Sequence, residues 1–385
     1  MKNQMAVKET KFKGIDKNPS LLGFGCMRFP VLSNESHDID EVLAQKMIDY
    51  AYSRGVNYFD TAYPYHHGLS EIFVGKALKK YPRESFYLAS KLPSWLIKSL
   101  DDVKRIFDEQ LKKCQVEYFD YYLCHALGKE NFKPYLIPGV MDYLYQMKKE
   151  GKIRHLGFSF HDTVEALDEI IHTYEWDFVQ LQLNYLDWSF LNAEKMYQIV
   201  EDYGVPCIVM EPVRGGTLAV LSEDAQKTFK AYHPDMSIAS WAIRYAASKA
   251  NVLTVLSGMS NFEQTEDNLN TVTNFKPIDE KEQKVIDQAL ASYLESKTIP
   301  CTSCNYCMPC PHGVEIPKNF SNYNKYAISK NKNSFINVYE NELEFSNADV
   351  CISCGECVEL CPQHIQIPDR MSDLSQIYID LKQKI

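Results

Sequence analysis

Eight cysteines in two regular runs are the residues of this sequence best suited to do chemistry. Each run ends in Cys-Pro, and the members are Cys301, Cys304, Cys307 and Cys310, then Cys351, Cys354, Cys357 and Cys361. Three thiolates spaced three residues apart can bind three irons of one cubane, while the fourth cysteine, before a proline, reaches the other cluster. The spacing therefore predicts two interleaved [4Fe-4S] clusters. One would be held by Cys301, Cys304, Cys307 and Cys361, and the other by Cys351, Cys354, Cys357 and Cys310.

Zinc and disulfides are the alternatives for these cysteines. Pairs of the form C-x-x-C also bind tetrahedral zinc, but zinc sites use two separated pairs without a third cysteine at the same step. Disulfides are disfavoured because the first residues, MKNQMAVKETKFKG, lack the apolar segment of a secretory signal. The other four cysteines lie in apolar or strand-like runs: Cys26, Cys114, Cys124 and Cys207. We therefore expect iron-sulfur clusters in a reducing compartment.

A second set of reactive side chains lies where short apolar runs end. One run leads into Asp60 and, five residues later, Tyr65; the next ends at Lys91 and the one after it at His125. In a barrel of parallel strands, the carboxyl ends of the strands face the active site. Singly, each residue has a structural explanation as a turn cap, a surface aromatic, a solvated strand end or a core histidine. Together they favour a catalytic site.

The elements that must position these residues alternate in type. Short apolar runs, typical of buried strands, are followed by stretches with helical period. Eight such strand and helix pairs predict an α/β fold, a (β/α)8 TIM barrel. A doubly wound open sheet is the alternative, but the segment 23–28 lacks the third glycine of the G-x-G-x-x-G fingerprint. The expected strands are 21–27, 58–62, 86–91, 121–125, 155–160, 178–184, 206–211 and 253–259, and the expected helices include 40–54, 70–80, 101–114, 138–150, 164–173, 193–203 and 237–247.

The sequence pattern changes after Lys276. A charged helix, expected over 279–296, leads to the first cysteine run, and two helix-compatible segments lie between the runs. We therefore predict two domains. The barrel would span 1–278, and a small, mainly helical ferredoxin-like domain with both clusters would span 279–385.

Composition excludes several classes of partner. The chain has 385 residues, 45% of them hydrophobic, and a net charge of -10 with no block of lysine or arginine, so nucleic acid is not expected to bind. No apolar stretch approaches the roughly 18 residues that a membrane-spanning helix needs. We expect a soluble, cytoplasmic protein.

The order of short motifs along the predicted barrel resembles the aldo-keto reductase family. Tyr65 follows Asp60 in an Asp-Thr-Ala context, and the resemblance extends over roughly residues 20 to 275. It includes Gly157-Phe158-Ser159-Phe160, Gln180-Leu181-Gln182-Leu183-Asn184-Tyr185, Met210-Glu211-Pro212-Val213 and the segment from Asn261 to Asn268. The resemblance implies hydride transfer between NAD(P)H and a carbonyl or alcohol substrate.

The resemblance also implies a role for each reactive residue. Tyr65 would donate the proton; because free tyrosine, with a pKa of about 10, is a weak acid, Lys91 is expected to lower that pKa while Asp60 holds Lys91 in place. His125 would hydrogen-bond the substrate carbonyl. The residues implied to contact the cofactor are Ser159 and Gln180, which would hold the carboxamide, together with Met27, Met210, Asn261, Gln264 and Asn268.

Three features depart from the family pattern. Met210 stands where many relatives stack an aromatic ring on the nicotinamide. Gln264 stands where an arginine usually clamps the 2'-phosphate of NADP, and Glu263 would repel a phosphate, so we expect a preference for NADH. The cluster domain occupies the part of the chain that closes the substrate pocket in relatives, and we expect it to wall the active site.

The two predicted halves use different electron chemistry. A nicotinamide donates two electrons as hydride, whereas a cubane passes one electron at a time, and a flavin would normally couple them. The leading hypothesis is an NAD(P)H-dependent reductase whose clusters are structural or receive electrons from a redox partner protein. The alternative is a ferredoxin-linked electron-transfer protein whose barrel binds a flavin or docks a redox partner.

Overall fold

The structure is a computed structural model that describes residues 5–33, 38–273 and 275–383. The chain divides into two compact units, of which the first comprises Met1–Pro212 and Ser240–Ile278 and the second comprises Val213–Ala239 and Asp279–Ile385. The second unit thus begins its main part at the residue where the cluster domain was expected. It also takes in 213–239, which the sequence analysis assigned to the barrel, because helix α8 of that segment packs along helix α11.

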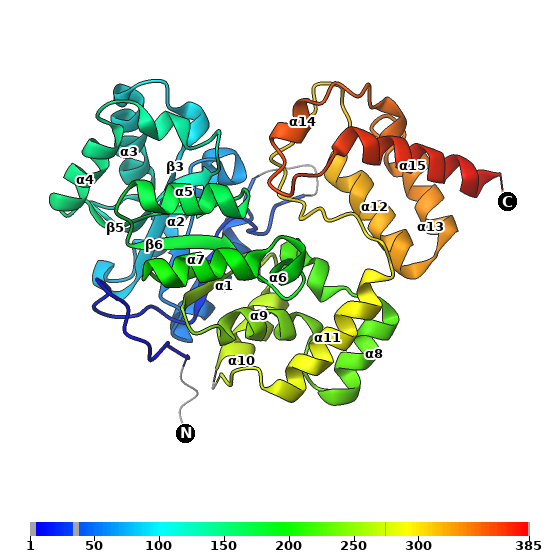
Figure 1. The fold of residues 1–385 in the computed structure, drawn as a ribbon, viewed down its shortest axis with the longest axis horizontal. Helices are drawn as coiled ribbons and strands as arrows, with labels where there is room; N and C mark the ends of the chain where they lie inside the picture. The colour runs from blue at the N-terminus through cyan, green and yellow to red at the C-terminus, as the bar shows by residue number, and fades with distance from the viewer. Residues whose placement is uncertain (1–4, 34–37, 274, 384–385) are drawn as a thin grey trace. The chain divides into compact units, whose positions relative to one another are not determined.

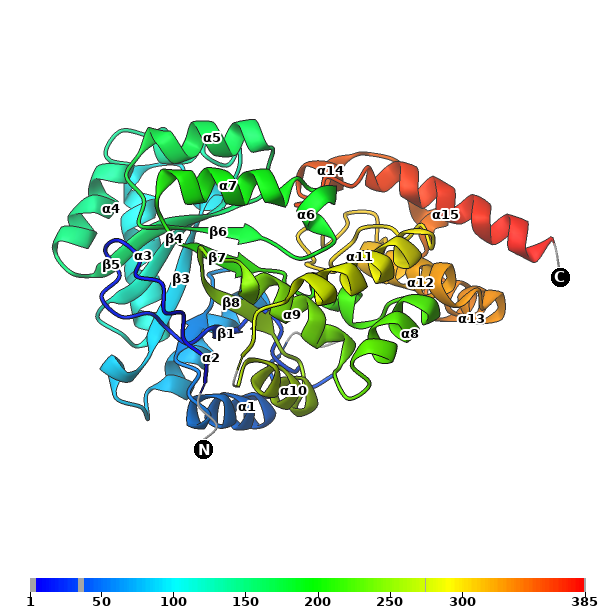
Figure 2. The same cartoon turned by 60° about the horizontal axis from the view of Figure 1, so that its bottom comes forward.

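The first unit is built on eight parallel strands that close into a barrel, in which β1 pairs with both β2 and β8. Figure 2 shows several of these strands, among them β6, β7 and β8. The predicted TIM barrel is therefore confirmed, and closure excludes an open doubly wound sheet. Both faces of these strands are covered, which is why they read as continuous apolar runs. Their bounds are β1 Leu22–Gly25, β2 Tyr58–Asp60, β3 Tyr87–Pro93, β4 Phe119–Leu127, β5 Ile153–Phe160, β6 Phe178–Gln182, β7 Cys207–Met210 and β8 Val252–Gly258.

Amphipathic helices surround the barrel (Figure 1). Several begin at a side chain that accepts a hydrogen bond from the first turn, as Asp40, Ser99, Thr163 and Asn261 do, which satisfies backbone N–H groups that have no partner within the helix. The helices whose ranges were predicted are present within a few residues: α1 Glu41–Ser53, α2 Leu69–Leu78, α3 Leu100–Cys114, α4 Val140–Lys149, α5 Val164–Thr173, α7 Ala193–Tyr203 and α9 Ile238–Ser248. Two further helices are α6 Asp187–Phe190 and α10 Phe262–Val272.

The segment before β1 closes the N-terminal end of the barrel, which the sequence analysis did not predict. Val7 pairs with Ser20 in an antiparallel bridge, and Phe12 and Ile15 are buried in one cluster with barrel residues such as Tyr121. Side chains therefore fill the barrel interior at this end, whereas the carboxyl ends of the strands, where TIM-barrel active sites lie, are at the other end.

The second unit is helical, as expected. Within its described residues no β-strand is present, and its core is built from side chains such as Phe320, Phe335, Tyr339 and Met371. Helix α11 begins at a capping box formed by Asp279. The helices are α8 Glu223–Tyr232, α11 Glu280–Leu294, α12 Ile316–Ser329, α13 Lys332–Asn337, α14 Glu356–Glu359 and α15 Ile367–Lys382. None of the described helices in either unit has the length and apolar character needed to cross a bilayer.

Candidate active site and cluster ligands

The four residues predicted to be catalytic meet at the carboxyl ends of the barrel strands. Asp60 ends β2, Lys91 lies in β3, His125 lies in β4, and Tyr65 begins the turn that follows β2. The Lys91 ammonium lies 2.6 Å from Asp60 Oδ1, 2.8 Å from the carbonyl oxygen of Thr61 and 3.2 Å from the Tyr65 hydroxyl oxygen. A buried cation therefore joins a carboxylate to a phenol.

The turn that carries Tyr65 is fixed by hydrogen bonds around it. The hydroxyls of Thr61 and Ser70 lie 2.9 Å apart, and the Phe29 backbone N–H donates to His66 Nε2 at 3.1 Å. Because these contacts tie both ends of the turn to its neighbours, the phenol has a defined position relative to Lys91.

Burial dominates the protonation of Tyr65. It raises the pKa of the phenol well above its ordinary value of about 10, and the carboxylates of Asp60 and Glu211 add to this rise, whereas Arg28 lowers the pKa. The expectation that this pKa falls below that of free tyrosine is therefore wrong for the chain by itself. The phenol keeps its proton at neutral pH, which is the form required of a proton donor. Burial also raises the pKa of Asp60, and Lys91 opposes that rise.

His125 packs beside Tyr65 as a neutral ring. The two ring centroids lie 6.2 Å apart in an edge-on arrangement, and the Trp95 ring lies 5.2 Å from His125 on another side. Burial, Lys91 and His161 hold the pKa of His125 well below its usual 6.5. The imidazole therefore acts as a neutral hydrogen-bonding group.

The lowered pKa of His125 predicts a pH dependence. Below pH 6.5 the His125 imidazole binds a proton in the unfolded chain but not in the folded chain. The contribution of neutral His125 to folding stability is therefore complete above pH 6.5 and is lost as the pH falls toward the pKa of His125 in the folded chain. In NMR spectra of protein labelled with 15N-histidine, the His125 signal is the imidazole signal that is absent from the spectrum of the His125→Gln variant. This imidazole should remain neutral below pH 6.5. His172→Gln, at an exposed position of α5, is the control. A His125 ring that titrates near 6.5 would contradict the prediction.

The residues expected to hold the carboxamide lie on neighbouring strands. Ser159 Oγ accepts from the Ala126 N–H at 2.8 Å, and Gln180 Nε2 lies 3.5 Å from the sulfur of Met210. Gln180 Oε1 is buried and has no hydrogen-bond partner among the described residues. Buried acceptors are normally paired, so this oxygen fits a ligand that brings an N–H donor, as a carboxamide does.

The remaining cofactor candidates lie near β8 and β1. Asn261 caps α10 by accepting from the Gln264 N–H at 2.8 Å, while Gln264 Oε1 accepts from the Ser260 N–H at 2.8 Å. Asn268 is buried and donates to Ser257 Oγ at 2.9 Å. Met27 is half-buried just beyond β1. Asn261, Gln264 and Asn268 therefore shape the β8 to α10 turn itself.

An ion pair that the sequence analysis missed joins the ends of β1 and β7 in this region. Arg28 Nη2 lies 3.6 Å from Glu211 Oε1, the Arg28 carbonyl accepts from Ser260 Oγ at 3.0 Å, and the Arg28 side chain lies against Gly258. One residue thus connects the ends of β1, β7 and β8. The sequence signal for this ion pair was Arg28 itself, a cation directly after the predicted first strand that stands where the glycine fingerprint has its third glycine.

Two cysteines of the second unit have neighbours from both runs. Burial raises the pKa of the Cys307 thiol, and the neighbouring thiols that add to this rise are Cys304, Cys301 and Cys361. The pKa of Cys357 rises to about 11 through burial and through Cys351, Cys354 and Cys310. Cys361 thus lies near Cys307, and Cys310 lies near Cys357.

All twelve cysteines are among the residues that the structure describes, and none of them forms a disulfide. Cys26, Cys114, Cys124 and Cys207 are buried in the first unit. Among the described residues, no group of three or more His, Cys, Asp or Glu side chains is arranged to hold a single metal ion. The thiols of each crossed set are neighbours without closing around one point.

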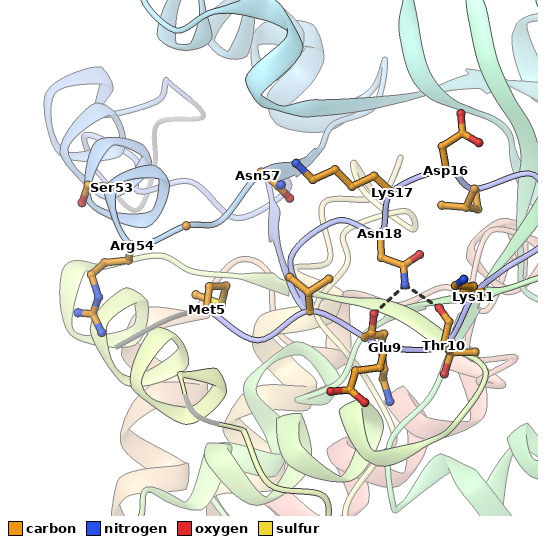
Figure 3. Close-up of a pocket in the computed structure, with 14 residues that line it drawn as sticks. Met5, Glu9, Thr10, Lys11, Asp16, Lys17, Asn18, Ser53, Arg54 and Asn57 are labelled. Carbon is orange, nitrogen blue, oxygen red and sulfur yellow. Dashed lines mark hydrogen bonds between the residues drawn. The ribbon is translucent and has the colours of Figure 1, made fainter. Parts of the chain in front are cut away.

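The large hollow of the first unit lies away from these residues. It has a volume of about 680 Å3 and is lined by the N-terminal segment and by residues that precede β2, such as Asn57 (Figure 3). Asn18 Nδ2 holds its wall by donating to the carbonyls of Lys8 and Thr10 at 2.8 and 2.7 Å. Asn57 precedes β2 whereas Asp60 ends it, so this hollow lies at the end of the barrel opposite the tetrad.

Two family profiles match the sequence. The aldo/keto reductase family matches residues 21–291, and a 4Fe-4S dicluster domain matches residues 300–365. These ranges cover, in turn, the barrel residues and the two cysteine runs.

Curated relatives and solved structures agree with the first profile. A probable aldo-keto reductase 1 of Glycine max is 30% identical over 207 residues, which is 51% of this chain and 57% of that protein. An NADH-specific methylglyoxal reductase of Escherichia coli is 28% identical over 200 residues, 47% of this chain and 60% of that protein. The chain thus spans less than two thirds of each. The structure of an aldo-keto reductase of Bacillus halodurans in its holo form has a TM-score of 0.62 and 26% identity, covering 74% of this chain and 96% of that one.

Proposed function

The chain belongs to the aldo/keto reductase family and carries a 4Fe-4S dicluster domain, and from this premise we propose that it transfers a hydride between NAD(P)H and a carbonyl or alcohol. The observation that carries the proposal is the position of Lys91, 2.6 Å from Asp60 Oδ1 and 3.2 Å from the Tyr65 hydroxyl. A protonated acid, a fixed cation and a neutral imidazole surround one point, which is what carbonyl reduction needs.

Each of the four tetrad side chains has a separate role in proton transfer. A bound nicotinamide would supply the hydride to the carbonyl carbon. Tyr65 gives its hydroxyl proton to the carbonyl oxygen, so that an alcohol forms and a phenolate remains. Lys91 stabilises that phenolate, and Asp60 keeps the ammonium in place. Neutral His125 donates a hydrogen bond to the carbonyl oxygen and orients it.

The cofactor would be held along the ends of β5 to β8. Gln180 Oε1 accepts from the carboxamide nitrogen, Ser159 supplies a hydroxyl beside it, and Met210 packs against the ring. The first turn of α10, with Asn261 at its start, receives the phosphates because a helix N-terminus attracts anions. Asn268 supports this turn through Ser257.

An isotope experiment tests the reaction directly. Purified full-length protein is mixed with NADH deuterated at C4 and with a panel of aldehydes and ketones. The alcohol product should gain one deuterium on the former carbonyl carbon. A panel that is reduced without deuterium transfer would show that the electrons arrive by another route.

The coenzyme is proposed to be NADH, because Gln264 and Glu263 at the start of α10 offer no cation to a 2'-phosphate. The similarity to an NADH-specific relative supports this. Titration should show tighter binding of NADH than of NADPH. Gln264→Arg should narrow the gap by a fraction of the roughly 1 to 3 kcal/mol expected of a charge-assisted hydrogen bond. Gln264→Met, which adds no charge, should leave the gap unchanged, and a wild type that prefers NADPH would refute the assignment.

The cysteine runs are proposed to hold two [4Fe-4S] clusters that exchange electrons with a redox partner protein. The crossed neighbourhoods of Cys307 and Cys357 support the two ligand sets. The alternative, a barrel that binds a flavin between clusters and substrate, predicts flavin absorbance in the purified protein. Release of flavin on denaturation would favour it over direct hydride transfer.

A further inference from the structure

A buried arginine of the second unit lies beside residues that adjoin the candidate ligands of the first cluster. Arg214 begins a short 3-10 helix, is almost wholly buried, and donates from Nη2 to Gln363 Oε1 at 3.1 Å. Gln363 is itself buried and stands two residues after Cys361. A buried guanidinium is costly to desolvate, so its position next to a cysteine run calls for a functional explanation.

The adjacent glycine makes a second, independent contact with the same cluster site. Gly215 has a φ of +63°, and a Cβ placed there would lie 2.1 Å from the carbonyl oxygen of Thr302. Thr302 directly follows Cys301, so the 214–215 backbone lies against the first cysteine run. The left-handed φ and the lack of space for a Cβ both require glycine at position 215. Arg214 and Gly215 together thus contact the neighbours of Cys301 and of Cys361, which come from different runs.

The guanidinium of Arg214 places a fixed positive charge among residues that adjoin Cys301 and Cys361. Reduction of a cubane adds one electron to the iron and sulfide core, and a fixed positive charge in a buried setting favours that added electron.

The other cysteine set has different surroundings. Cys310, Cys351, Cys354 and Cys357 line a common site with mostly apolar side chains, such as Val314, Ile316 and Met371. Cys354 is exposed. The second unit contains one further arginine, Arg370, whose half-exposed side chain pairs with Asp373 and is screened by water.

We propose that Arg214 sets the reduction potential of the cluster bound by Cys301, Cys304, Cys307 and Cys361, making it the better electron acceptor of the two. This rests on the proposed cluster ligation. Exposed Cys354 would bring its cluster within reach of a one-electron redox protein, and Arg214 would favour the single electron on the cluster beside it.

Potentiometric titration tests this role. Full-length Arg214→Gln and Arg214→Lys proteins are purified anaerobically, their iron content is measured, and reduction by dithionite is followed by EPR. Arg214→Gln should make the reduction of one cluster at least tenfold less favourable, a shift of about 59 mV to more negative potential for one electron, and leave the other unchanged. Arg214→Lys should retain most of the wild-type potential because it keeps the charge.

The same titration includes a control variant and defines the results that would contradict the proposal. Lys227→Gln removes an exposed charge of α8 that lies near Glu223 and Asp224, and it should shift neither cluster. Unchanged potentials in iron-replete Arg214→Gln, or an equal shift in Lys227→Gln, would overturn the proposal. If Arg214→Gln does not retain iron, the Gln363→Glu variant tests the proposal instead. A carboxylate beside the guanidinium should lower the reduction potential of the same cluster. An iron-replete Gln363→Glu protein with the wild-type potential would equally overturn it. Failure of both clusters to assemble in the wild type would refute the ligation itself.

Discussion

Replacing Tyr65 with phenylalanine should lower the turnover of carbonyl reduction by a factor on the order of 10² or more, with NADH binding nearly unchanged. The change removes the hydroxyl that lies 3.2 Å from Lys91 and keeps the ring that packs edge-on to His125. Without that proton the developing alkoxide must take one from water. Steady-state kinetics with a carbonyl substrate measures the loss, and titration with NADH measures cofactor binding.

A neighbouring tyrosine provides the matched control. Tyr63 lies two residues earlier, and its hydroxyl donates to Glu109 at 3.0 Å. Tyr63→Phe should therefore keep wild-type turnover, since it removes the same group from the same turn without touching Lys91. Full activity in Tyr65→Phe, or an equal loss in Tyr63→Phe, would show that Tyr65 is not the proton donor.

The barrel could be predicted from sequence because its strands are buried on both faces and its helices carry one apolar stripe. These are local patterns, and they placed β6 and α5 within two residues. The residues 5–20 have no such period, because Phe12 and Ile15 are held by distant barrel residues. The grouping of 213–239 with the second unit could not be read from local pattern either, because the packing of α8 along α11 depends on a partner more than forty residues away.

The site was predictable in its residue types and less so in its electrostatics. Strand-end positions brought Asp60 and Lys91 together as expected, because parallel strands share one catalytic end. The pKa of Tyr65 was misjudged because charge can be read from sequence whereas burial cannot, and burial is the larger cause. Arg28 was missed because its ion pair with Glu211 joins the ends of strands far apart in the chain.

Anaerobically purified protein should contain about eight irons and eight acid-labile sulfides per chain, because the two cysteine sets supply four thiolates to each cubane. Cys361→Ala should reduce both counts by about half. The thiols it frees should be those of Cys301, Cys304 and Cys307, since Cys361 lies near Cys307. Alkylation under anaerobic conditions followed by peptide mass spectrometry identifies the freed thiols.

The reciprocal variant separates crossed ligation from ligation within each run. Cys310→Ala should expose Cys351, Cys354 and Cys357 to alkylation and protect the first run, because Cys310 lies beside Cys357. Ligation within each run predicts the opposite pattern for both variants, and a zinc site predicts zinc in place of iron and sulfide. Cys207→Ala, a buried cysteine of β7, should leave the iron count unchanged. If Cys361→Ala also retains deuterium transfer from NADH to substrate, the cluster it destroys lies outside the hydride path, because hydride moves as a two-electron unit that a cubane cannot carry.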